Sequence, residues 1–193
     1  MMEATVAKLS PLLQRTEDDP RPVVVMMCGI AGAGKSTLSK ALVSAHPQFH
    51  RLTLDGILAK RHGIFGVDYA PEKYSAYLDE AAEECKEQLT RLLTEGSDVV
   101  FDRAFWNQED RDEAKEIIER LGARWVLVYL KAPDKATLWQ RICRRREIEL
   151  NADSAYLITQ DTLDMYWNGF EEPVDEGATV VDTRLNAVNQ ESG

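Results

Sequence analysis

The sequence has few cysteines and no long apolar segment, and each shortage excludes a class of protein. Three cysteines occur, Cys28, Cys85 and Cys143, and none belongs to a C-x-x-C pair. This pattern excludes a disulfide framework and a cysteine-based zinc site, and it is typical of a reducing compartment. No apolar run approaches the roughly 20 residues that cross a membrane, and residues 1–15 lack the apolar core of a signal peptide. We therefore expect a soluble, cytoplasmic protein with no membrane partner.

Basic residues are also scarce relative to acidic ones. The chain has 23 Lys and Arg against 33 Asp and Glu, which gives a formal net charge of −10. Because binding to polyanions depends on basic patches, this balance disfavours a general nucleic-acid or membrane-surface binder, although it leaves room for a local basic groove. A length of 193 residues with 44% hydrophobic side chains fits one domain with a substantial core.

Apolar runs typical of buried strands alternate with helical patterns along most of the chain. This alternation predicts an α/β protein built from parallel β-α-β units. We expect strands over residues 23–27, 51–54, 98–101, 124–130 and 178–181. We expect helices over residues 36–45, 71–94, 108–121, 133–146 and 154–167. The expected organisation is an N-terminal helix and linker over residues 1–22, a main domain over residues 23–183 and a C-terminal tail over residues 184–193.

The run GIAGAGKS, from Gly29 to Ser36, has the G-x-x-x-x-G-K-[ST] spacing of a phosphate-binding loop, and it lies between a predicted strand and a predicted helix. Glycines let backbone N–H groups turn toward phosphate oxygens, and a helix N-terminus adds a positive end. We predict that Lys35 contacts the β- and γ-phosphates and that Ser36 offers its hydroxyl to Mg²⁺. The alternative is a tight turn with a solvated lysine. The predicted nucleotide contacts in this segment are Gly29, Ala31, Gly32, Ala33, Gly34, Lys35, Ser36 and Thr37.

The motifs that the chain lacks narrow the class of nucleotide-binding protein. It has no N-K-x-D guanine signature and no L-S-G-G-Q-like signature, which disfavours a GTPase and an ABC ATPase. An AAA+ motor needs a longer chain for its helical lid and arginine finger. Small phosphotransferases remain, and these need a carboxylate that activates the acceptor, a carboxylate on the Mg²⁺ side and mobile arginines.

Two aspartates follow predicted strands, at the edge where parallel strands face a ligand crevice. Asp55 closes the run LTLD and is the candidate general base for an acceptor hydroxyl. Asp102 closes the run VVFD, which resembles a Walker B strand, and is the candidate that holds an Mg²⁺ water or orients an arginine or the acceptor. The alternative for each aspartate is a structural cap, and Arg103 is a local partner available to Asp102.

Arginines concentrate near residue 145 in an otherwise acidic chain. Arg141, Arg144 and Arg145 have the i, i+3, i+4 spacing of one helical face, and Arg146 adds a fourth cation. Such a face can neutralise charge on a transferred phosphoryl group, whereas a solvated face paired with nearby glutamates is the alternative. We predict that this arginine cluster supplies positive charge to the transferred phosphoryl group.

Other candidate residues leave two interpretations open. Arg111 directly follows Glu109 and Asp110, so a surface ion pair and a functional role are both open. Four aromatic residues lie near the predicted crevice loops, where they either shape an acceptor pocket or belong to the core. They are Phe65, Tyr69, Phe105 and Trp106.

Together these segments resemble the AAA-type P-loop ATP-binding kinases related to zeta toxin, chloramphenicol phosphotransferase and polynucleotide 5′-kinase domains. The resemblance covers about residues 23–183. It rests on GIAGAGKST at 29–37, LTLD at 52–55, FGVDYAPEKY at 65–74, VVFDRAFWNQEDRDEA at 99–114, WVLVYLKAP at 125–133, RICRRREIELNADSAY at 141–156 and FEEPVDEGATVVDT at 170–183.

The resemblance implies a three-layer αβα sandwich around a five-stranded parallel sheet of order 2-3-1-4-5, with a helical arginine lid. It also implies ATP- and Mg²⁺-dependent phosphorylation of a hydroxyl. Lys35 and Ser36 match the phosphate and Mg²⁺ positions, and Asp55 matches the base. Asp102 matches the carboxylate after the third strand, and we assign it to the metal side together with Ser36. Arg141 and Arg145 are similar in placement to lid arginines, so the resemblance implies a lid over about residues 141–155 in which both arginines act in catalysis and Arg141 also binds the nucleotide.

One position departs from the polynucleotide-kinase pattern. Such members often carry an arginine three residues after the base, where this chain has Leu58, and Lys60 or Arg61 is the available replacement. We therefore expect a small-molecule acceptor, with a 5′-hydroxyl polynucleotide as the alternative. A nucleotide-binding module or slow ATPase without an acceptor also stays open. The sequence indicates no oligomeric state.

Overall fold

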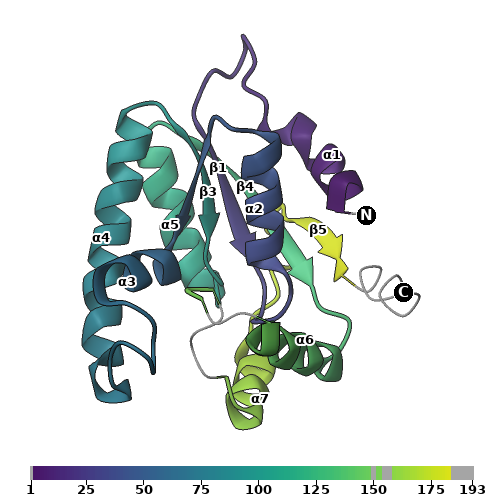
Figure 1. The fold of residues 1–193 in the computed structure, drawn as a ribbon. Helices are drawn as coiled ribbons and strands as arrows, with labels where there is room; N and C mark the ends of the chain where they lie inside the picture. The colour runs from purple at the N-terminus through teal and green to yellow at the C-terminus, as the bar shows by residue number, and fades with distance from the viewer. Residues whose placement is uncertain (1, 149–150, 154–157, 184–193) are drawn as a thin grey trace.

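A five-stranded parallel sheet forms the middle layer of the protein (Figure 1). The computed structural model describes residues 2–148, 151–153 and 158–183. The strands lie in the order β2-β3-β1-β4-β5, and each neighbouring pair is parallel. Their bounds are β1 Val23–Cys28, β2 Phe49–Thr53, β3 Asp98–Asp102, β4 Arg124–Lys131 and β5 Thr179–Asp182. The predicted fold class and strand order are confirmed.

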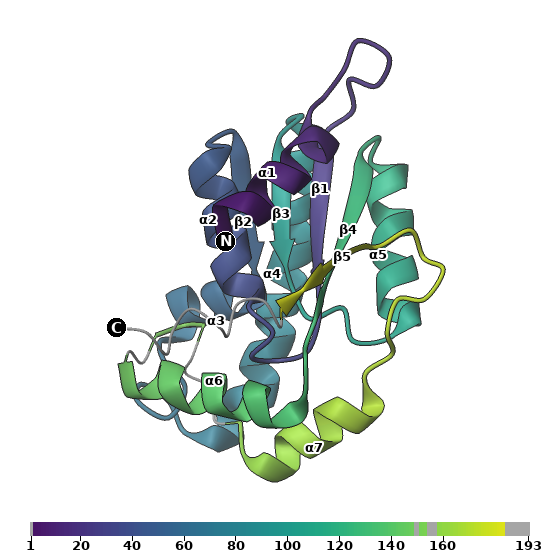
Figure 2. The same cartoon turned by 90° about the vertical axis from the view of Figure 1, so that its right-hand side faces the viewer.

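Helices cover the sheet and extend beyond one of its ends. Figures 1 and 2 both place α6 and α7 beyond the end toward which the strands point. A short 3₁₀ turn at Pro71–Lys73 precedes α4. The helix bounds are α1 Met2–Leu13, α2 Lys35–Ala45, α3 Leu54–His62, α4 Tyr74–Thr94, α5 Gln108–Arg120, α6 Lys135–Ile148 and α7 Gln160–Gly169.

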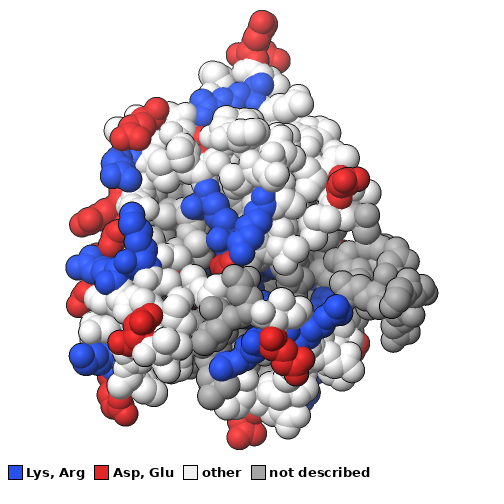
Figure 3. Space-filling model, viewed as in Figure 1, with Lys and Arg blue, Asp and Glu red and all other residues white. Residues whose placement is uncertain are grey.

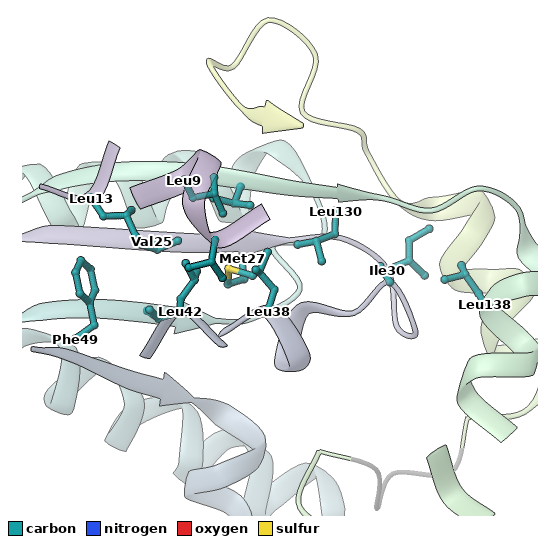
Figure 4. Packing of buried hydrophobic residues seen from close by; sticks show 14 of the residues in the cluster. Leu9, Leu13, Val25, Met27, Ile30, Leu38, Leu42, Phe49, Leu130 and Leu138 are labelled. Atoms are coloured by element: carbon teal, nitrogen blue, oxygen red, sulfur yellow. The ribbon is translucent and has the colours of Figure 1, made fainter. Parts of the chain in front are cut away.

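The central strand β1 is buried along its whole length, as expected for a sheet covered on both faces. Successive side chains of a strand point to opposite faces. Val25 and Met27 pack in a hydrophobic cluster with α1 and α2, part of which is seen in Figure 4. Val24 and Met26 pack in a second cluster with α4 and α5. The phosphate-binding segment therefore follows a strand that is held from both sides.

The boundary between β2 and α3 differs from the prediction. The strand ends at Thr53 and the helix begins at Leu54, so the strand expected over residues 51–54 lies earlier in the chain. Asp55 consequently occupies the first turn of α3 and does not close a strand. An acidic side chain in the first turn interacts favourably with the positive end of the helix dipole.

The segments expected at the two ends of the chain and around the lid are described only in part. The segment expected over residues 1–22 contains α1, in which Leu9 and Leu13 are buried. The helix expected over residues 154–167 is observed only from Gln160, while residues 154–157 and the expected tail at 184–193 lie outside the described residues. Of the helices that the structure describes, none is long and apolar enough to cross a bilayer.

Candidate functional site

The predicted phosphate-binding loop connects β1 to α2 and needs its glycines. Gly29, Gly32 and Gly34 all have positive φ angles, of 144°, 82° and 102°, a region that other residues rarely adopt. A Cβ atom on Gly32 would lie 3.0 Å from the Leu138 carbonyl oxygen, and one on Gly29 would lie 2.9 Å from that of Leu130. Packing against β4 and α6 therefore leaves room only for glycine at these two places.

Lys35 begins α2 and turns back over the loop. Its Nζ donates hydrogen bonds to the carbonyl oxygens of Gly29, at 2.7 Å, and Ile30, at 3.1 Å. Burial lowers the pKa of Lys35, and the negative charges of Asp102 and Asp55 oppose this change. The ammonium group thus lies against the loop carbonyls, where the charges of two carboxylates act on it. The next residue, Ser36, is half-buried at the same helix N-terminus.

Asp55 lies beyond the end of β2, and its residue is exposed to solvent. Even so, surrounding protein raises its pKa to about 6, and the negative charges of Asp102 and Asp153 add to the rise. The two observations fit a carboxylate at the mouth of a concave site, which water reaches from one side only. Lys35 and Arg145 act in the opposite direction and lower this pKa.

Asp102 ends β3 and is buried with two partners that the sequence did not indicate. The Ser39 hydroxyl donates to its Oδ2 at 2.8 Å, and Arg51 Nη2 donates to the same oxygen at 2.5 Å. The local partner considered above, Arg103, instead lies 4.0 Å from Asp110. Arg51 was not predicted as a site residue, because an arginine within an edge strand is usually solvated and no sequence motif includes this position.

Arg51 also joins the sheet to the segment between α6 and α7. Its Nη2 donates to Asp153 Oδ1 at 2.7 Å, and Lys40 Nζ lies 2.5 Å from Asp153 Oδ2. Burial alone would raise the pKa of Asp153, but the bonds from Lys40 and Arg51 lower it. A chain of charged contacts, Lys40–Asp153–Arg51–Asp102, therefore runs from the predicted lid to the end of β3.

The arginines of α6 point to different places. Arg141 Nη2 donates to the Thr183 carbonyl oxygen at 2.9 Å, just beyond β5. Burial lowers the pKa of Arg145, whereas the charges of Asp153 and Asp55 raise it, so its guanidinium lies close to those carboxylates. Arg145 therefore interacts with the charge of the predicted base, whereas Arg141 bonds beside β5. Figure 3 shows basic side chains gathered over α2 and α6 on this face.

A cavity of about 770 Å³ opens beside the phosphate-binding loop. This volume lies in the range of small-ligand sites. Its walls come from the loop, α2, α6, β4, β5 and the first turns of α1. The loop and α2 contribute Gly32, Ala33, Gly34, Thr37 and Leu38, α6 contributes Thr137, Gln140, Arg141, Arg144, Arg145 and Ile148, and α1 contributes Met2 and Thr5.

A second, much smaller cavity of about 20 Å³ lies at Asp55. Apolar and aromatic side chains surround the carboxylate there, and no Lys or Arg is among the described lining residues. The lining is Asp55, Leu58, Ala59, Gly63, Phe65, Tyr69, Tyr74 and Ala152. The Tyr69 hydroxyl is buried without a hydrogen-bond partner among the described residues. Two of the four aromatic residues singled out in the sequence, Phe65 and Tyr69, therefore lie at this cavity.

The other two aromatic residues and Arg111 have structural roles. Phe105 is buried against Phe101, and Trp106 packs edge-on against Tyr166 of α7. Arg111 is fully buried, so the surface ion pair considered above is wrong. Its Nη2 lies 2.6 Å from Glu176 Oε1, and its Nη1 donates to the Phe105 and Glu171 carbonyl oxygens at 3.0 and 2.9 Å. These bonds fix the segment that follows Asp102.

The fold and the loop define a P-loop nucleotide-binding protein of the kinase type. Residues 24–173 match the AAA domain family AAA_33, and the chain belongs to this family. Adenylyl-sulfate kinase from Staphylococcus carnosus is 29% identical in sequence, over 81% of this chain and 82% of that protein. The predicted family relationship, including its ATP-binding kinase character, is confirmed.

Solved structures support the same fold. A proposed kinase from Chloroflexus aurantiacus superimposes with a TM-score of 0.67 at 17% identity, over 84% of this chain and 88% of that one. A gluconokinase from Sinorhizobium meliloti gives 0.55 at 19% identity, over 89% and 85%. A chain of the Pnkp1/Rnl/Hen1 RNA repair complex gives 0.63 at 15% identity, and there the match covers 77% of this chain but 44% of the other.

The residues at the loop also fit Mg²⁺, although the described part of the chain holds no ready-made cluster of three or more His, Cys, Asp or Glu side chains. Mg²⁺ beside phosphates keeps several waters and needs few protein ligands. Ser36 offers a hydroxyl at the N-terminus of α2. The bonds that Asp102 accepts from described residues all reach Oδ2, which leaves Oδ1 as the oxygen available to a metal-bound water.

Proposed function

We propose that the protein is an ATP- and Mg²⁺-dependent kinase that transfers the γ-phosphate to a hydroxyl of a small-molecule acceptor. The observation that carries the proposal is the position of Asp55. This carboxylate stays in contact with solvent, has a pKa raised to about 6 and lines a cavity separate from the larger cavity beside the loop. A general base works best when its pKa lies near the working pH.

In the proposed reaction, the acceptor hydroxyl binds at Asp55 and the triphosphate binds along the loop. The hydroxyl proton moves to an Asp55 carboxylate oxygen while the acceptor oxygen forms a bond to the γ-phosphorus. The bond between that phosphorus and the β–γ bridging oxygen breaks, and ADP leaves with the electron pair. The products are ADP and a phosphate monoester, and Asp55 then releases its proton to water.

Lys35, Arg145 and Arg141 supply positive charge in this proposal. Lys35 lies against the loop carbonyls, a position from which its ammonium can turn to the β- and γ-phosphates. Arg145 lies near Asp55, where it neutralises charge on the transferred phosphoryl group. Arg141, on the β5 side, binds the nucleotide. Ser36 and Asp102 are the residues that would hold Mg²⁺, which would supply further positive charge at the phosphates.

The surroundings of Asp55 favour a small molecule over a polynucleotide end. A 5′-terminal nucleotide carries a phosphodiester on its 3′ side, which a cation near the base would recognise. The position three residues after Asp55 is Leu58, and it lines the cavity together with Phe65 and Tyr69. Arg61 instead pairs with Glu84 on α4 at 3.0 Å. These contacts support an uncharged alcohol as the part of the acceptor that enters.

The test is a screen for transfer of labelled γ-phosphate from ATP to small alcohols and to 5′-hydroxyl oligonucleotides. We expect a small alcohol as acceptor and expect Asp55→Asn to lower its turnover by about 10²–10⁴-fold, the usual contribution of a general base, without loss of ATP binding. Labelling of oligonucleotides alone would favour the polynucleotide alternative. Turnover that survives Asp55→Asn contradicts the assigned base, and ATP hydrolysis with no acceptor found would favour a slow ATPase.

A further inference from the structure

The N-terminal helix α1 is docked onto the nucleotide-binding core by apolar contacts. Val6, Leu9 and Leu13 form its buried face and belong to the same hydrophobic cluster as Leu38 and Leu42 of α2. Figure 4 shows Leu9 and Leu13 directed into this cluster. Because α2 begins directly after the phosphate-binding loop, α1 is held against the helix that carries Lys35.

Polar contacts fix the same helix and the linker after it. Ser10 Oγ lies 2.8 Å from His46 Nε2, at the C-terminal end of α2. Arg15 Nε donates to Asp98 Oδ1 at 2.9 Å, and the backbone N–H of Val23 donates to the same oxygen at 2.8 Å. The start of α1 therefore points in a direction set by contacts on the helix itself and on the linker.

That direction brings Met2 and Thr5 to the wall of the cavity beside the loop. Both residues are half-buried, and Met2 also packs against the hydrophobic cluster that holds α1. They lie in this wall together with Thr37 of α2 and Val181 of β5. The wall is thus built by elements from both ends of the described chain.

The nucleoside of bound ATP belongs on this side of the loop. The triphosphate lies along the loop with its γ-phosphate toward Asp55, and Asp55 lines the other cavity. The base and ribose must therefore leave the loop on the opposite side, where the 770 Å³ cavity lies. We propose that Met2 and Thr5 of α1 form the nucleoside-side wall of the ATP site, with the Met2 thioether packing on the base and Thr5 facing the base or ribose.

This inference rests on the ATP-binding part of the proposed function, and it assigns α1 to ligand binding as well as to the core. The test is Thr5→Trp in the full chain, because an indole at this position would occupy the space of the nucleoside. Calorimetry compares Mg-ATP with Mg-tripolyphosphate, which has the phosphates but no nucleoside. We expect the ATP dissociation constant to rise about tenfold or more, equal to about 1.4 kcal/mol, with tripolyphosphate binding unchanged.

Ala7→Trp is the matched control, because Ala7 is exposed on α1 and does not line the cavity. It should bind both ligands as the wild type does. Met2→Trp gives the same test from a second position if Thr5→Trp fails to fold, as judged by its melting temperature. Unchanged ATP affinity in a folded variant, or an equal loss for both ligands, overturns the inference. Absence of ATP binding in the wild type contradicts the proposed function instead.

Discussion

Asp55 stays in contact with solvent although its pKa is raised from 3.8 to about 6. Because the folded state holds this proton more tightly than the unfolded state, the linked stabilisation is present below the unfolded pKa and is lost as the pH rises through the folded pKa. The ionised form that acts as a base is therefore the form that destabilises the fold. Solvent screening makes this effect smaller than it would be for an enclosed carboxylate.

We predict opposite effects of Asp55→Asn on stability and activity. The variant should melt at a higher temperature than the wild type at pH 8, and the difference should shrink as the pH falls to 4, since the folded wild type is then protonated at this position. The wild-type transfer rate should fall below about pH 6. Thermal melts over this pH range, with the exposed Asp79→Asn as control, measure the effect, and a difference independent of pH contradicts it.

A second prediction also concerns a single residue, Arg51. It donates to the buried Asp102 and to Asp153, so Arg51→Met keeps most of the aliphatic stem but leaves a buried carboxylate without its cation. Loss of one partner of a buried pair typically costs about 3–5 kcal/mol. We expect a loss of stability near the lower bound, because Ser39 still donates to Asp102. Urea denaturation measures it.

The matched control for Arg51→Met is Arg21→Met, whose partner Asp19 forms an exposed pair at 2.7 Å. Exposed pairs contribute about 0–1 kcal/mol, so this variant should unfold near the wild-type urea concentration. If the two variants lose equal stability, the contacts of Arg51 with Asp102 and Asp153 do not stabilise the fold.

The candidate site was predictable only where its residues lie close together in the sequence. Lys35, Ser36 and Asp55 were found because each lies in a short local pattern. Arg51 and Asp102 are 51 positions apart in sequence, and only the pairing of β2 with β3 brings them together. Arg111 was misjudged for the same reason, since its partner Glu176 lies beyond α7.

At the scale of elements, the phosphate-binding loop depends on its contact with α6. We predict that Gly32→Ala weakens ATP binding, because the added methyl group meets the Leu138 carbonyl oxygen at 3.0 Å and Ile142 at 3.1 Å. Backbone strain of about 1–3 kcal/mol corresponds to a rise of about 5-fold to 150-fold in the ATP dissociation constant. Calorimetry measures this constant.

Gly96→Ala separates the contact from the strain of a positive φ angle. Gly96 has a φ of 77°, close to the 82° of Gly32, but a Cβ there meets nothing within 4 Å. This variant should lose some stability and keep its ATP affinity. Equal ATP affinity in both variants would show that the packing of the loop on α6 does not affect the nucleotide site.

Element boundaries were less predictable than the elements themselves. In the run LTLD, the alternation of apolar and polar residues continues past the point where β2 ends. The chain changes to a helix at Leu54, where the first helical turn gains Asp55. Periodicity over four residues cannot separate these two states, so the strand was extended too far, while the expectation that Asp55 lies near the ends of the strands was correct.

At the scale of the whole molecule, the alternation of strands and helices predicted a parallel sheet, whereas the strand order was predicted from the resemblance to P-loop kinases. Parallel strands need crossover connections, and right-handed crossovers leave few arrangements. The role of residues 2–13 was not predictable, since an amphipathic helix pattern does not say which groove receives it. The net charge of −10 is compatible with the site, because basic side chains gather over α2 and α6, whereas basic and acidic side chains are mixed along the edge formed by α3 and α4 (Figure 3).

The docking of α1 has a practical consequence for experiments on this protein. Met2 is among the residues that line the large cavity, so an affinity tag fused ahead of it would begin beside the cavity in which we propose that the nucleoside binds. The nucleotide affinity measured with such a fusion would include the effect of the tag on the site. Nucleotide affinities should therefore be measured after the tag has been removed by a protease that leaves no extra residues.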